Sequence, residues 1–364
     1  MKGKGRRNSP QQPKTGTLSL SSWLEGLVVS HLGQGLAVET PEGNIILCQT
    51  RRRLGDVAVG DRVLWEPSED GMQGRVEEVL PRRSMLIRPG YAGKLKVVAA
   101  NLDRVFIVIS PSPAPDWLLV DQYLAVCEFR HIRAEIIFNK IDVADNGVQG
   151  DFQKYLPPFL TGGQKSSPSL KKGGQGGGAQ NEEPDKPFSE LDQVLAELSD
   201  YVRIGYPVHP VSAHKGIGMV ELKYAVHGHC SIFAGQSGVG KSSLTNTLLP
   251  KKNLRIGEIS ERSGLGRHTT TAATLYNLPE GGYLIDSPGV AVFGLAEIKG
   301  QDLAWGYREF QAHIGHCRFN DCRHINDKGC AVREGVENGG IAPARHQRYL
   351  KLLGKLAQPD TVWE

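Results

Sequence analysis

The sequence predicts a multidomain fold with an N-terminal β-barrel of the oligonucleotide-binding (OB) type, a central α/β domain and a mainly helical, zinc-binding C-terminal domain. Three observations predict it. Short apolar runs separated by turn residues occupy residues 26–89, strand and helix patterns alternate from residue 101, and three cysteines and a histidine cluster between residues 317 and 330. A chain of 364 residues is also too long for one ordinary hydrophobic core.

Composition and charge exclude several classes of protein. No apolar run approaches the roughly 18 residues of a membrane span, and the first 14 residues lack the apolar core of a signal peptide. We therefore expect a cytoplasmic protein without a membrane partner. The formal net charge of +4 permits an acidic partner without requiring one.

Residues 1–20 form a basic tail without an acidic residue. Such a charge pattern predicts disorder, and the tail either contacts nucleic-acid phosphates or stays solvated. Its basic residues are Lys2, Lys4, Arg6, Arg7 and Lys14.

About five strand patterns lie within the predicted barrel, residues 21–95. This number within the roughly 65 residues from 26 to 89 is typical of a small closed barrel, for which the OB fold is the leading candidate. One loop contains Arg51, Arg52 and Arg53. RNA often binds a basic loop on this type of barrel, so we favour nucleic-acid binding over a solvated turn. The strand patterns cover residues 27–29, 36–38, 45–47, 63–65 and 76–79.

The central domain, residues 100–295, begins with strand patterns at 104–110 and 134–138 on either side of a helical pattern at 117–130. Apolar runs of this kind are typical of buried strands in a parallel sheet. Residues 147–187 form a low-complexity insertion for which we expect no fixed structure. A helix at 188–201, a strand ending at Val211 and a helix beginning near Met219 follow.

Residues 235–242 match the phosphate-binding pattern G-x-x-x-x-G-K-[ST], between a strand pattern at 229–234 and a helical pattern at 242–249. In this context backbone N–H groups and the helix dipole hold phosphate oxygens. We expect Lys241 to reach the β- and γ-phosphates and the Ser242 hydroxyl to bind Mg²⁺. The predicted nucleotide contacts of this loop are Gly235, Gln236, Ser237, Gly238, Val239, Gly240, Lys241, Ser242 and Ser243.

A guanine-reading motif, N-K-x-D, follows the strand at 134–138. The Asp142 carboxylate can accept hydrogen bonds from N1–H and the N2 amine of guanine, which adenine does not offer, while Asn139 faces the other edge. Lys140 covers the flat face of the base with its aliphatic stem. Ser212 and Ala213, after the strand that ends at Val211, resemble the backbone element that closes over guanine O6.

Two further segments have the composition of nucleotide-sensing loops. Residues 266–271 contain three threonines, of which we favour Thr270 as a second Mg²⁺ ligand, with Thr269 and Thr271 as alternatives. After a strand pattern at 283–285, Asp286 is placed to hold Mg²⁺ through water and the Gly289 N–H to bond the γ-phosphate.

Val290 follows Gly289, where Ras-like enzymes carry the glutamine that orients the attacking water. Intrinsic hydrolysis should therefore be slow. His268 is our candidate for positioning water, because an imidazole can accept a hydrogen bond near neutral pH. The alternative is a solvated loop histidine.

The C-terminal cluster consists of Cys317, Cys322, His324 and Cys330. Three thiolates and one imidazole form the ligand set of a closed, tetrahedral zinc site, which stabilises a fold and catalyses nothing. His313 and His316 are rival ligands, but His324 lies inside the cysteine bracket. The other three cysteines, Cys48, Cys127 and Cys230, read as buried free thiols rather than disulfides.

The order of the nucleotide motifs is unusual, because the base-reading elements precede the phosphate loop. A circular permutation explains this order, since all the loops remain at the carboxyl edge of one sheet whichever strand comes first. Over about residues 20–355 the chain closely resembles the permuted ribosome small subunit-dependent GTPase A family, through the motifs at 139–142, 235–242, 266–271 and 286–289. The insertion and the length of the tail depart from the family pattern.

The resemblance implies an OB barrel, a permuted GTPase domain and a zinc domain, the last at 296–364. It implies an enzyme that hydrolyses Mg²⁺-bound GTP to GDP, binds the small ribosomal subunit and its rRNA, assists late maturation and leaves after hydrolysis. It also supports His268 as the residue that positions water and His324 as the zinc ligand. We expect a monomer.

Two other classes of protein remain open on the residues alone. A metabolic kinase would also use residues 235–242 but has no need for Asn139 and Asp142. A nucleic-acid-binding module with a degenerate nucleotide site would leave Lys241, Ser242 and Asp286 without a reason to occur together.

The last helical pattern, residues 345–356, is amphipathic and basic. It predicts an apolar side with Tyr349, Leu352 and Leu353. On the opposite side, Arg345, Arg348 and Lys351 are expected to be exposed, where they contact RNA or solvent.

Overall fold

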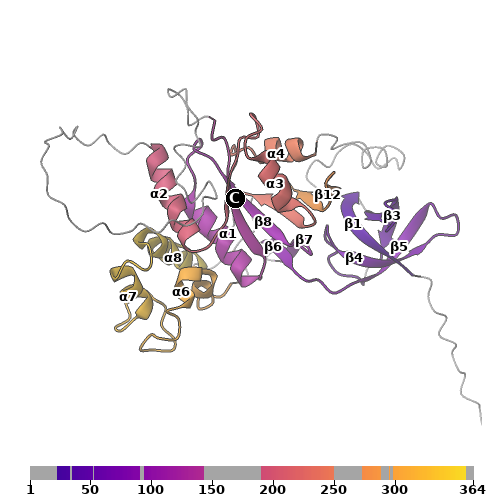
Figure 1. Ribbon diagram of the computed structural model, residues 1–364. Helices are drawn as coiled ribbons and strands as arrows, with labels where there is room; N and C mark the ends of the chain where they lie inside the picture. Colours follow the sequence, from indigo (N-terminus) through magenta and orange to yellow (C-terminus); the bar gives the residue numbers. More distant parts are fainter. Residues whose placement is uncertain are drawn as a thin grey trace, which may run out of the picture.

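A single curved sheet runs from the N-terminal barrel into the central domain, and the C-terminal helices pack on the far side (Figure 1). The computed structural model describes residues 23–32, 35–51, 53–90, 94–142, 190–249, 273–287, 295 and 298–357. The predicted tail at 1–20 and the insertion at 147–187 lie outside these residues.

Five strands close the barrel in the order β1-β2-β3-β5-β4, with β4 pairing back onto β1. β3 and β5 are parallel and the other pairs are antiparallel, which is the topology of the OB fold. Alternate side chains such as Val28, Val38 and Trp65 fill its core. The five predicted strands are confirmed as β1 (Leu24–Leu32), β2 (Gly35–Glu39), β3 (Ile45–Thr50), β4 (Arg62–Pro67) and β5 (Gln73–Val79).

A hairpin that sequence analysis did not identify connects the barrel to the central domain. It consists of β6 (Met85–Pro89) and β7 (Leu95–Ala100), which pair only with each other among the described strands. Leu86 and Ala99 are fully buried in the hydrophobic core shared with the central domain.

The central part of the sheet contains five parallel strands in the order β10-β9-β8-β11-β13, followed by β12, which is antiparallel to β13. Apolar runs form these strands because both faces of the sheet are covered. Their bounds are β8 (Arg104–Ile109), β9 (Arg133–Phe138), β10 (Val208–Pro210), β11 (Cys230–Ala234), β12 (Thr274–Asn277) and β13 (Tyr283–Asp286).

Helices cover both faces of this sheet. On one face, α1 (Trp117–Phe129) and α2 (Glu190–Arg203) pack on side chains such as Ile107 and Ile136. On the other, α3 (Met219–Val226) and α4 (Lys241–Leu248) pack on Phe106 and Ile137. All four helices were predicted within a few residues.

The barrel joins the sheet through a β1–β12 pairing at Ser30 and Thr274. A second link lies nearby, where the Asn277 amide donates to Glu39 Oε1 at 2.7 Å. Beside these links is a cavity of about 790 Å³ lined by both the barrel and the sheet. The two parts are thus continuous in hydrogen bonding.

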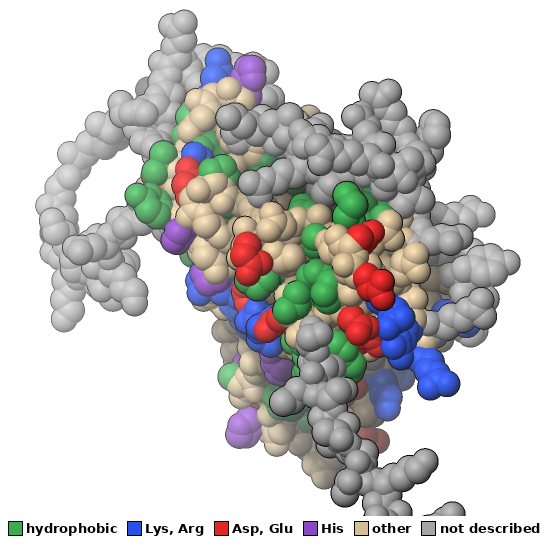
Figure 2. All heavy atoms as spheres, turned by 90° about the vertical axis from the view of Figure 1, so that its right-hand side faces the viewer, with side chains coloured by type: hydrophobic (Ala, Val, Ile, Leu, Met, Phe, Trp, Pro, Cys, Tyr) green, Lys and Arg blue, Asp and Glu red, His purple; other side chains and the backbone are tan. Residues whose placement is uncertain are grey.

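The barrel side of the molecule mixes acidic and basic side chains instead of presenting a basic patch (Figure 2). Residues 23–90 carry ten Asp and Glu against eight Lys and Arg. Arg51, in the predicted RNA-binding loop, is exposed but pairs with Glu77 at 2.8 Å. Arg53 is exposed as well, and Arg52 lies outside the described residues.

The C-terminal part is mainly helical, and its last helix, α8, packs against α1. Its buried Tyr349, Leu352 and Leu353 agree with the predicted apolar side. Its elements are the 3₁₀ helix η5 (Leu303–Gly306) and the helices α6 (Arg308–Gln311), α7 (Ala331–Glu337) and α8 (Pro343–Leu356).

The prediction that Arg345 and Arg348 are exposed is wrong, although Lys351 is exposed as expected. Arg345 is 1% exposed and Arg348 8%. Carboxylates from three other elements surround them, which the helical period of α8 alone cannot reveal. Within the part of the chain that the structure describes, no helix has the length and apolarity needed to cross a membrane.

Candidate functional site

The carboxyl ends of β8, β9, β10, β11 and β13 all lie at one edge of the sheet. This follows from the parallel pairing of those strands, which places their carboxyl ends side by side. The predicted phosphate loop follows β11 directly, and the residues predicted to read guanine follow β9. Segments that are far apart in the sequence therefore meet in one site.

The phosphate loop requires glycine at two close approaches. A Cβ on Gly235 would lie 2.3 Å from the Val108 carbonyl oxygen, and one on Gly240 would lie 2.3 Å from Asn139 Nδ2. Both residues also have positive φ, of 138° and 95°. The loop can therefore curl tightly against β8 and against the guanine-reading motif only with glycine at these positions.

Lys241 begins α4 and its side chain folds back over the loop. Its Nζ donates to the carbonyl oxygens of Gly235 at 2.7 Å and Gln236 at 2.6 Å. Burial lowers the pKa of this amine. Ser242 and Ser243 in the same helical turn are exposed. The helix N-terminus thus offers an ammonium group, two hydroxyls and free N–H groups to an anion.

Asn139 joins three loops of the site. It is 1% exposed. Its amide nitrogen donates to the Val239 carbonyl at 2.9 Å, and its Oδ1 accepts from the Ala213 N–H at 3.2 Å. Asn139 is predicted to contact the base. These bonds show that it also connects the surrounding loops, which the sequence motif does not indicate.

Lys140 lies across the opening between two loops. Its φ is 61°, and its Nζ donates to the carbonyl oxygens of Ser112 at 2.8 Å and Gly238 at 2.6 Å. The Lys140 side chain therefore connects the loop after β8 with the predicted phosphate loop. Asp142, two residues later, is partly exposed.

Ser212 is fully buried and Ala213 partly buried in the loop after β10. The Ser212 Oγ accepts from the Lys215 N–H at 3.0 Å, which stabilises the turn. Because Ala213 bonds to Asn139, this loop adjoins the guanine-reading motif as predicted.

Sequence analysis missed the loop at 110–116 as part of the site. The Gln236 side chain accepts from the Asp116 N–H at 2.6 Å and donates to the Ala114 carbonyl at 2.8 Å. Asp116 also caps α1 by accepting from Leu118 and Leu119. The N-cap pattern before residue 117 was the available signal for this loop.

Asp286 is the last residue of β13 and lies beside Thr274 of β12. This places it at the same carboxyl edge as the phosphate loop. Burial raises the pKa of Tyr276, and the charge of Asp286 raises it further.

Three of the predicted catalytic residues, His268, Thr270 and Gly289, lie outside the described residues, as do Thr269 and Thr271.

The four side chains predicted to bind zinc come together in one cluster, and His324 is the histidine that belongs to it. The ligand atoms of Cys317, Cys322, His324 and Cys330 lie within 4.8 Å of one another. His324 Nδ1 is 3.6, 3.5 and 3.5 Å from the three sulfurs, in that order.

These distances fit a tetrahedral ion. Sulfur and nitrogen ligands at about 2.3 and 2.0 Å from such an ion lie roughly 3.5 Å apart. The rival ligands His313 and His316 are not part of the cluster. Surrounding groups orient it, since the His346 ring lies 2.9 Å from the His324 carbonyl and the Tyr349 hydroxyl donates to the Arg323 carbonyl at 2.9 Å.

The other three cysteines are buried free thiols, as predicted. Burial raises the pKa of Cys48 and of Cys230 to about 12, which keeps both thiols protonated and unreactive at neutral pH.

Comparisons with known proteins agree with this geometry. A family model described as RsgA GTPase matches residues 79–157 and 185–296. A "Small ribosomal subunit biogenesis GTPase RsgA" of Azotobacter vinelandii is 40% identical over 339 residues, covering 92% of this chain and 86% of the relative. A protein with the same description from Mannheimia succiniciproducens is 40% identical over 332 residues, covering 90% and 82%.

Two solved structures share the fold. YjeQ from Thermotoga maritima has a TM-score of 0.66 at 29% identity, covering 93% of this chain and 100% of that chain. YloQ, described as a circularly permuted GTPase, has a TM-score of 0.64 at 23% identity, covering 93% and 97%. The second likeness supports the permuted fold alone.

Proposed function

The chain belongs to the RsgA GTPase family, and we propose that it acts on the small ribosomal subunit. In this proposal the protein binds the subunit in its GTP form, hydrolyses GTP to GDP and phosphate when the subunit stimulates it, and assists late maturation before leaving. The observation that carries the proposal is the direct bond between the guanine-reading Asn139 and the phosphate loop at Val239. The relatives, which are named as biogenesis GTPases of the small ribosomal subunit, support the choice of partner.

The proposed nucleotide contacts follow the geometry of the loops. Asp142 accepts from the N1–H and N2 groups of guanine, and the stem of Lys140 covers the ring. The Ala213 loop closes over O6. Backbone N–H groups of residues 235–243 hold the phosphates, and Lys241 exchanges its two carbonyl partners for phosphate oxygens.

The catalytic roles extend to residues outside the described part of the chain. Ser242, Thr270 and Asp286 would hold Mg²⁺, which neutralises charge on the phosphates when bound. The Gly289 N–H would bond the γ-phosphate, and His268 would position the attacking water in place of a glutamine.

The Cys₃His cluster is proposed to hold one structural zinc ion. The fit of the sulfur and nitrogen positions to a tetrahedral site supports this, as do the four protein ligands, which leave no position for a substrate. The ion would stabilise the loop at 317–330 against α8.

This loop carries features suited to rRNA. Arg318 and Phe319 stack at 5.6 Å, Phe319 is 48% exposed, and the basic Arg323 and Lys328 lie nearby in the sequence. Aromatic rings with guanidinium groups stack on unpaired bases. Residues 298–357 carry ten Lys and Arg against six Asp and Glu. We therefore propose that the zinc loop, together with the barrel loop at 51–53, contacts the subunit, and that the protein works as a cytoplasmic monomer.

The first test is steady-state hydrolysis of GTP and ATP by the purified protein, alone and with purified small or large ribosomal subunits. The proposal expects the small subunit alone to raise GTP turnover, with ATP turnover flat. GTP turnover that ignores both subunits would contradict the proposed partner. Turnover of ATP with a small-molecule acceptor would instead indicate a metabolic kinase.

The second test addresses release. Subunit affinity is measured by sedimentation with a non-hydrolysable GTP analogue and with GDP. The proposal expects tighter binding in the analogue form, and equal affinities would rule out release driven by hydrolysis.

A further inference from the structure

We propose that Asp121, Arg345 and Arg348 are positioning residues for the nucleotide site. They hold α1 in place from the C-terminal part of the chain, and α1 in turn holds the phosphate loop. The inference rests on the proposed binding of guanine nucleotide at residues 235–243.

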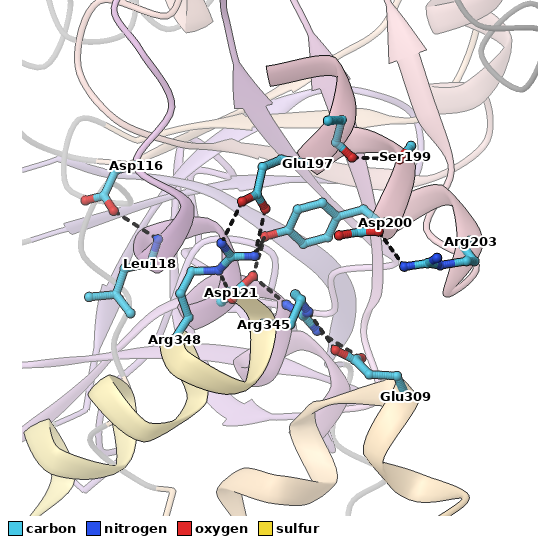
Figure 3. A network of polar contacts seen from close by, with 12 residues as sticks. Asp116, Leu118, Asp121, Glu197, Ser199, Asp200, Arg203, Glu309, Arg345 and Arg348 are labelled. Carbon is cyan, nitrogen blue, oxygen red and sulfur yellow. Dashed lines mark hydrogen bonds and ion pairs between the residues drawn. The ribbon is translucent and has the colours of Figure 1, made fainter. Parts of the chain in front are cut away.

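Asp121 lies at the centre of a buried ion cluster (Figure 3). Its Oδ1 accepts from Arg345 and from the Tyr201 hydroxyl, and its Oδ2 accepts from Arg348 Nε at 2.6 Å. The carboxylate is fully buried. One aspartate of α1 therefore binds two arginines of α8 and a tyrosine of α2.

Each arginine is completed by a second carboxylate. Arg345 donates to both oxygens of Glu309, at 2.7 and 3.0 Å, and Arg348 donates to both oxygens of Glu197, at 3.3 and 3.0 Å. The Arg345 guanidinium also stacks on Tyr307 at 4.5 Å. Fork-shaped pairs of this kind fix orientation as well as distance. Removing one member leaves the others charged and buried, so their neighbours must move.

The same N-terminal half of α1 that carries Asp121 is bonded to the phosphate loop. Asp116, its N-cap, donates its N–H to Gln236, whose amide donates to the Ala114 carbonyl. Tyr123, in the next turn, is fully buried. Burial and the charge of Asp116 raise the pKa of Tyr123, while a hydrogen bond with the Gly235 backbone opposes the shift. α1 thus contacts the first two residues of the phosphate loop.

The same turn of α8 is anchored from its other side. His346 and Tyr349 lie against the carbonyl oxygens of His324 and Arg323, in the loop that carries the Cys₃His cluster. Arg345 and Arg348 therefore project from a helix that is held independently of α1. Because α8 is bonded to this loop as well as to α1, its two arginines can hold α1 in a fixed position. Arginines on a mobile segment could not do so.

The test compares two fully buried aspartates, each of which accepts hydrogen bonds from arginine. Asp121→Asn removes the charge that binds both arginines without changing volume. Asp61→Asn also removes a buried carboxylate charge without changing volume, but in the barrel. Asp61 is fully buried there and accepts from Arg82 at 2.7 and 2.8 Å. Each full-length variant is titrated with fluorescent GDP below its own melting temperature, and kcat and KM for GTP are measured separately.

We expect Asp121→Asn to bind GDP about tenfold more weakly than the wild type, in the usual range of coupling between sites. The GDP affinity of Asp61→Asn should stay within about twofold of the wild-type affinity, even if its melting temperature falls as far as that of Asp121→Asn. Wild-type GDP affinity in a folded Asp121→Asn protein would overturn the inference, and so would equal losses in both variants.

Arg348→Met and Arg348→Lys decide the matter if Asp121→Asn does not fold. Lysine keeps the charge, so it should retain GDP affinity better than methionine. Wild-type GDP affinity in both the Arg348→Met and the Arg348→Lys variant would overturn the inference. If the wild-type protein bound no guanine nucleotide, the proposed function would be wrong. That outcome is distinct from a failure of the inference about Asp121, in which the wild type binds GDP and the variant binds it equally well.

Discussion

The side-chain nitrogen of Asn139 lies 2.9 Å from the carbonyl oxygen of Val239, 100 residues further along the chain. The same side chain accepts from Ala213, 74 residues away. One buried amide therefore holds the two loops predicted to read the base against the predicted phosphate loop. Because 100 residues separate these loops along the chain, the bond has a structural role in addition to the proposed contact with the base.

Replacing Asn139 by alanine should weaken GDP binding by about tenfold or more. The change leaves the Val239 carbonyl and the Ala213 N–H without their partner, and such a loss costs about 1–3 kcal/mol. Isothermal titration with GDP measures it. Asn101→Ala is the matched control, because Asn101 is also buried and bonds Gly60 and Arg83 outside the site. Similar GDP affinity in the two variants would contradict the role of Asn139.

Asp142→Asn should change the base preference of the site. The amide can donate to the C2 oxygen of xanthine, but it loses the carboxylate that accepts from guanine N2. We expect GDP affinity to fall about a hundredfold and xanthosine diphosphate affinity to rise. Competition titrations with the two nucleotides measure the switch, with Asp200→Asn on α2 as a surface control. If GDP remained the preferred ligand, Asp142 would not read the base.

Atomic absorption should detect one zinc ion per chain. The Cys330→Ser and His324→Ala variants should bind no zinc. The melting temperature should fall by more than about 5 °C, because metal binding is coupled to folding of the loop. Cys230→Ser, a buried cysteine outside the cluster, should keep the metal. Full metal content in His324→Ala would point to His313 or His316 as the ligand.

Glu135 should stabilise the fold in a pH-dependent way. Burial alone would raise its pKa, but the hydrogen bond and charge of His209 and the charges of Arg104 and Arg133 lower it overall. A carboxyl whose pKa is lower when folded contributes stability above its unfolded pKa of about 4.3, and that contribution is lost as the pH falls through the folded value.

The melting temperature of Glu135→Gln should therefore be several degrees below the wild type at pH 7, since breaking a buried pair costs about 3 kcal/mol. The gap should narrow as the pH falls below about 4. A gap that stays constant from neutral to acid pH would mean that packing, and not charge, explains the loss.

His268→Ala should leave GTP affinity nearly unchanged and lower subunit-stimulated turnover by about a hundredfold, the usual contribution of a proton-accepting side chain. Single-turnover hydrolysis with saturating small subunits measures it. His227→Ala, an exposed histidine after α3, serves as the control. Unchanged turnover would remove His268 from the mechanism.

Sequence by itself determined the features whose chemistry is local. Eight consecutive residues, 235–242, contain the whole predicted phosphate-binding pattern, because that pattern depends on the backbone groups of one turn. The Cys₃His ligands lie within 14 residues, from Cys317 to Cys330, and alternating apolar runs were enough to predict the barrel and the parallel sheet. Each of these patterns can be read without knowing which segments become neighbours.

Only the tertiary structure decided what depends on distant partners. Arg345 and Arg348 lie on the polar side of α8 by their spacing, yet both are buried, because Asp121 comes to them from 224 and 227 residues away. Bonds from Asn139 to Val239 and from Gln236 to Asp116 are equally long-range. Periodicity reports how polar a helix face is. Whether water or an opposite charge satisfies that face is set by the chain packing around it.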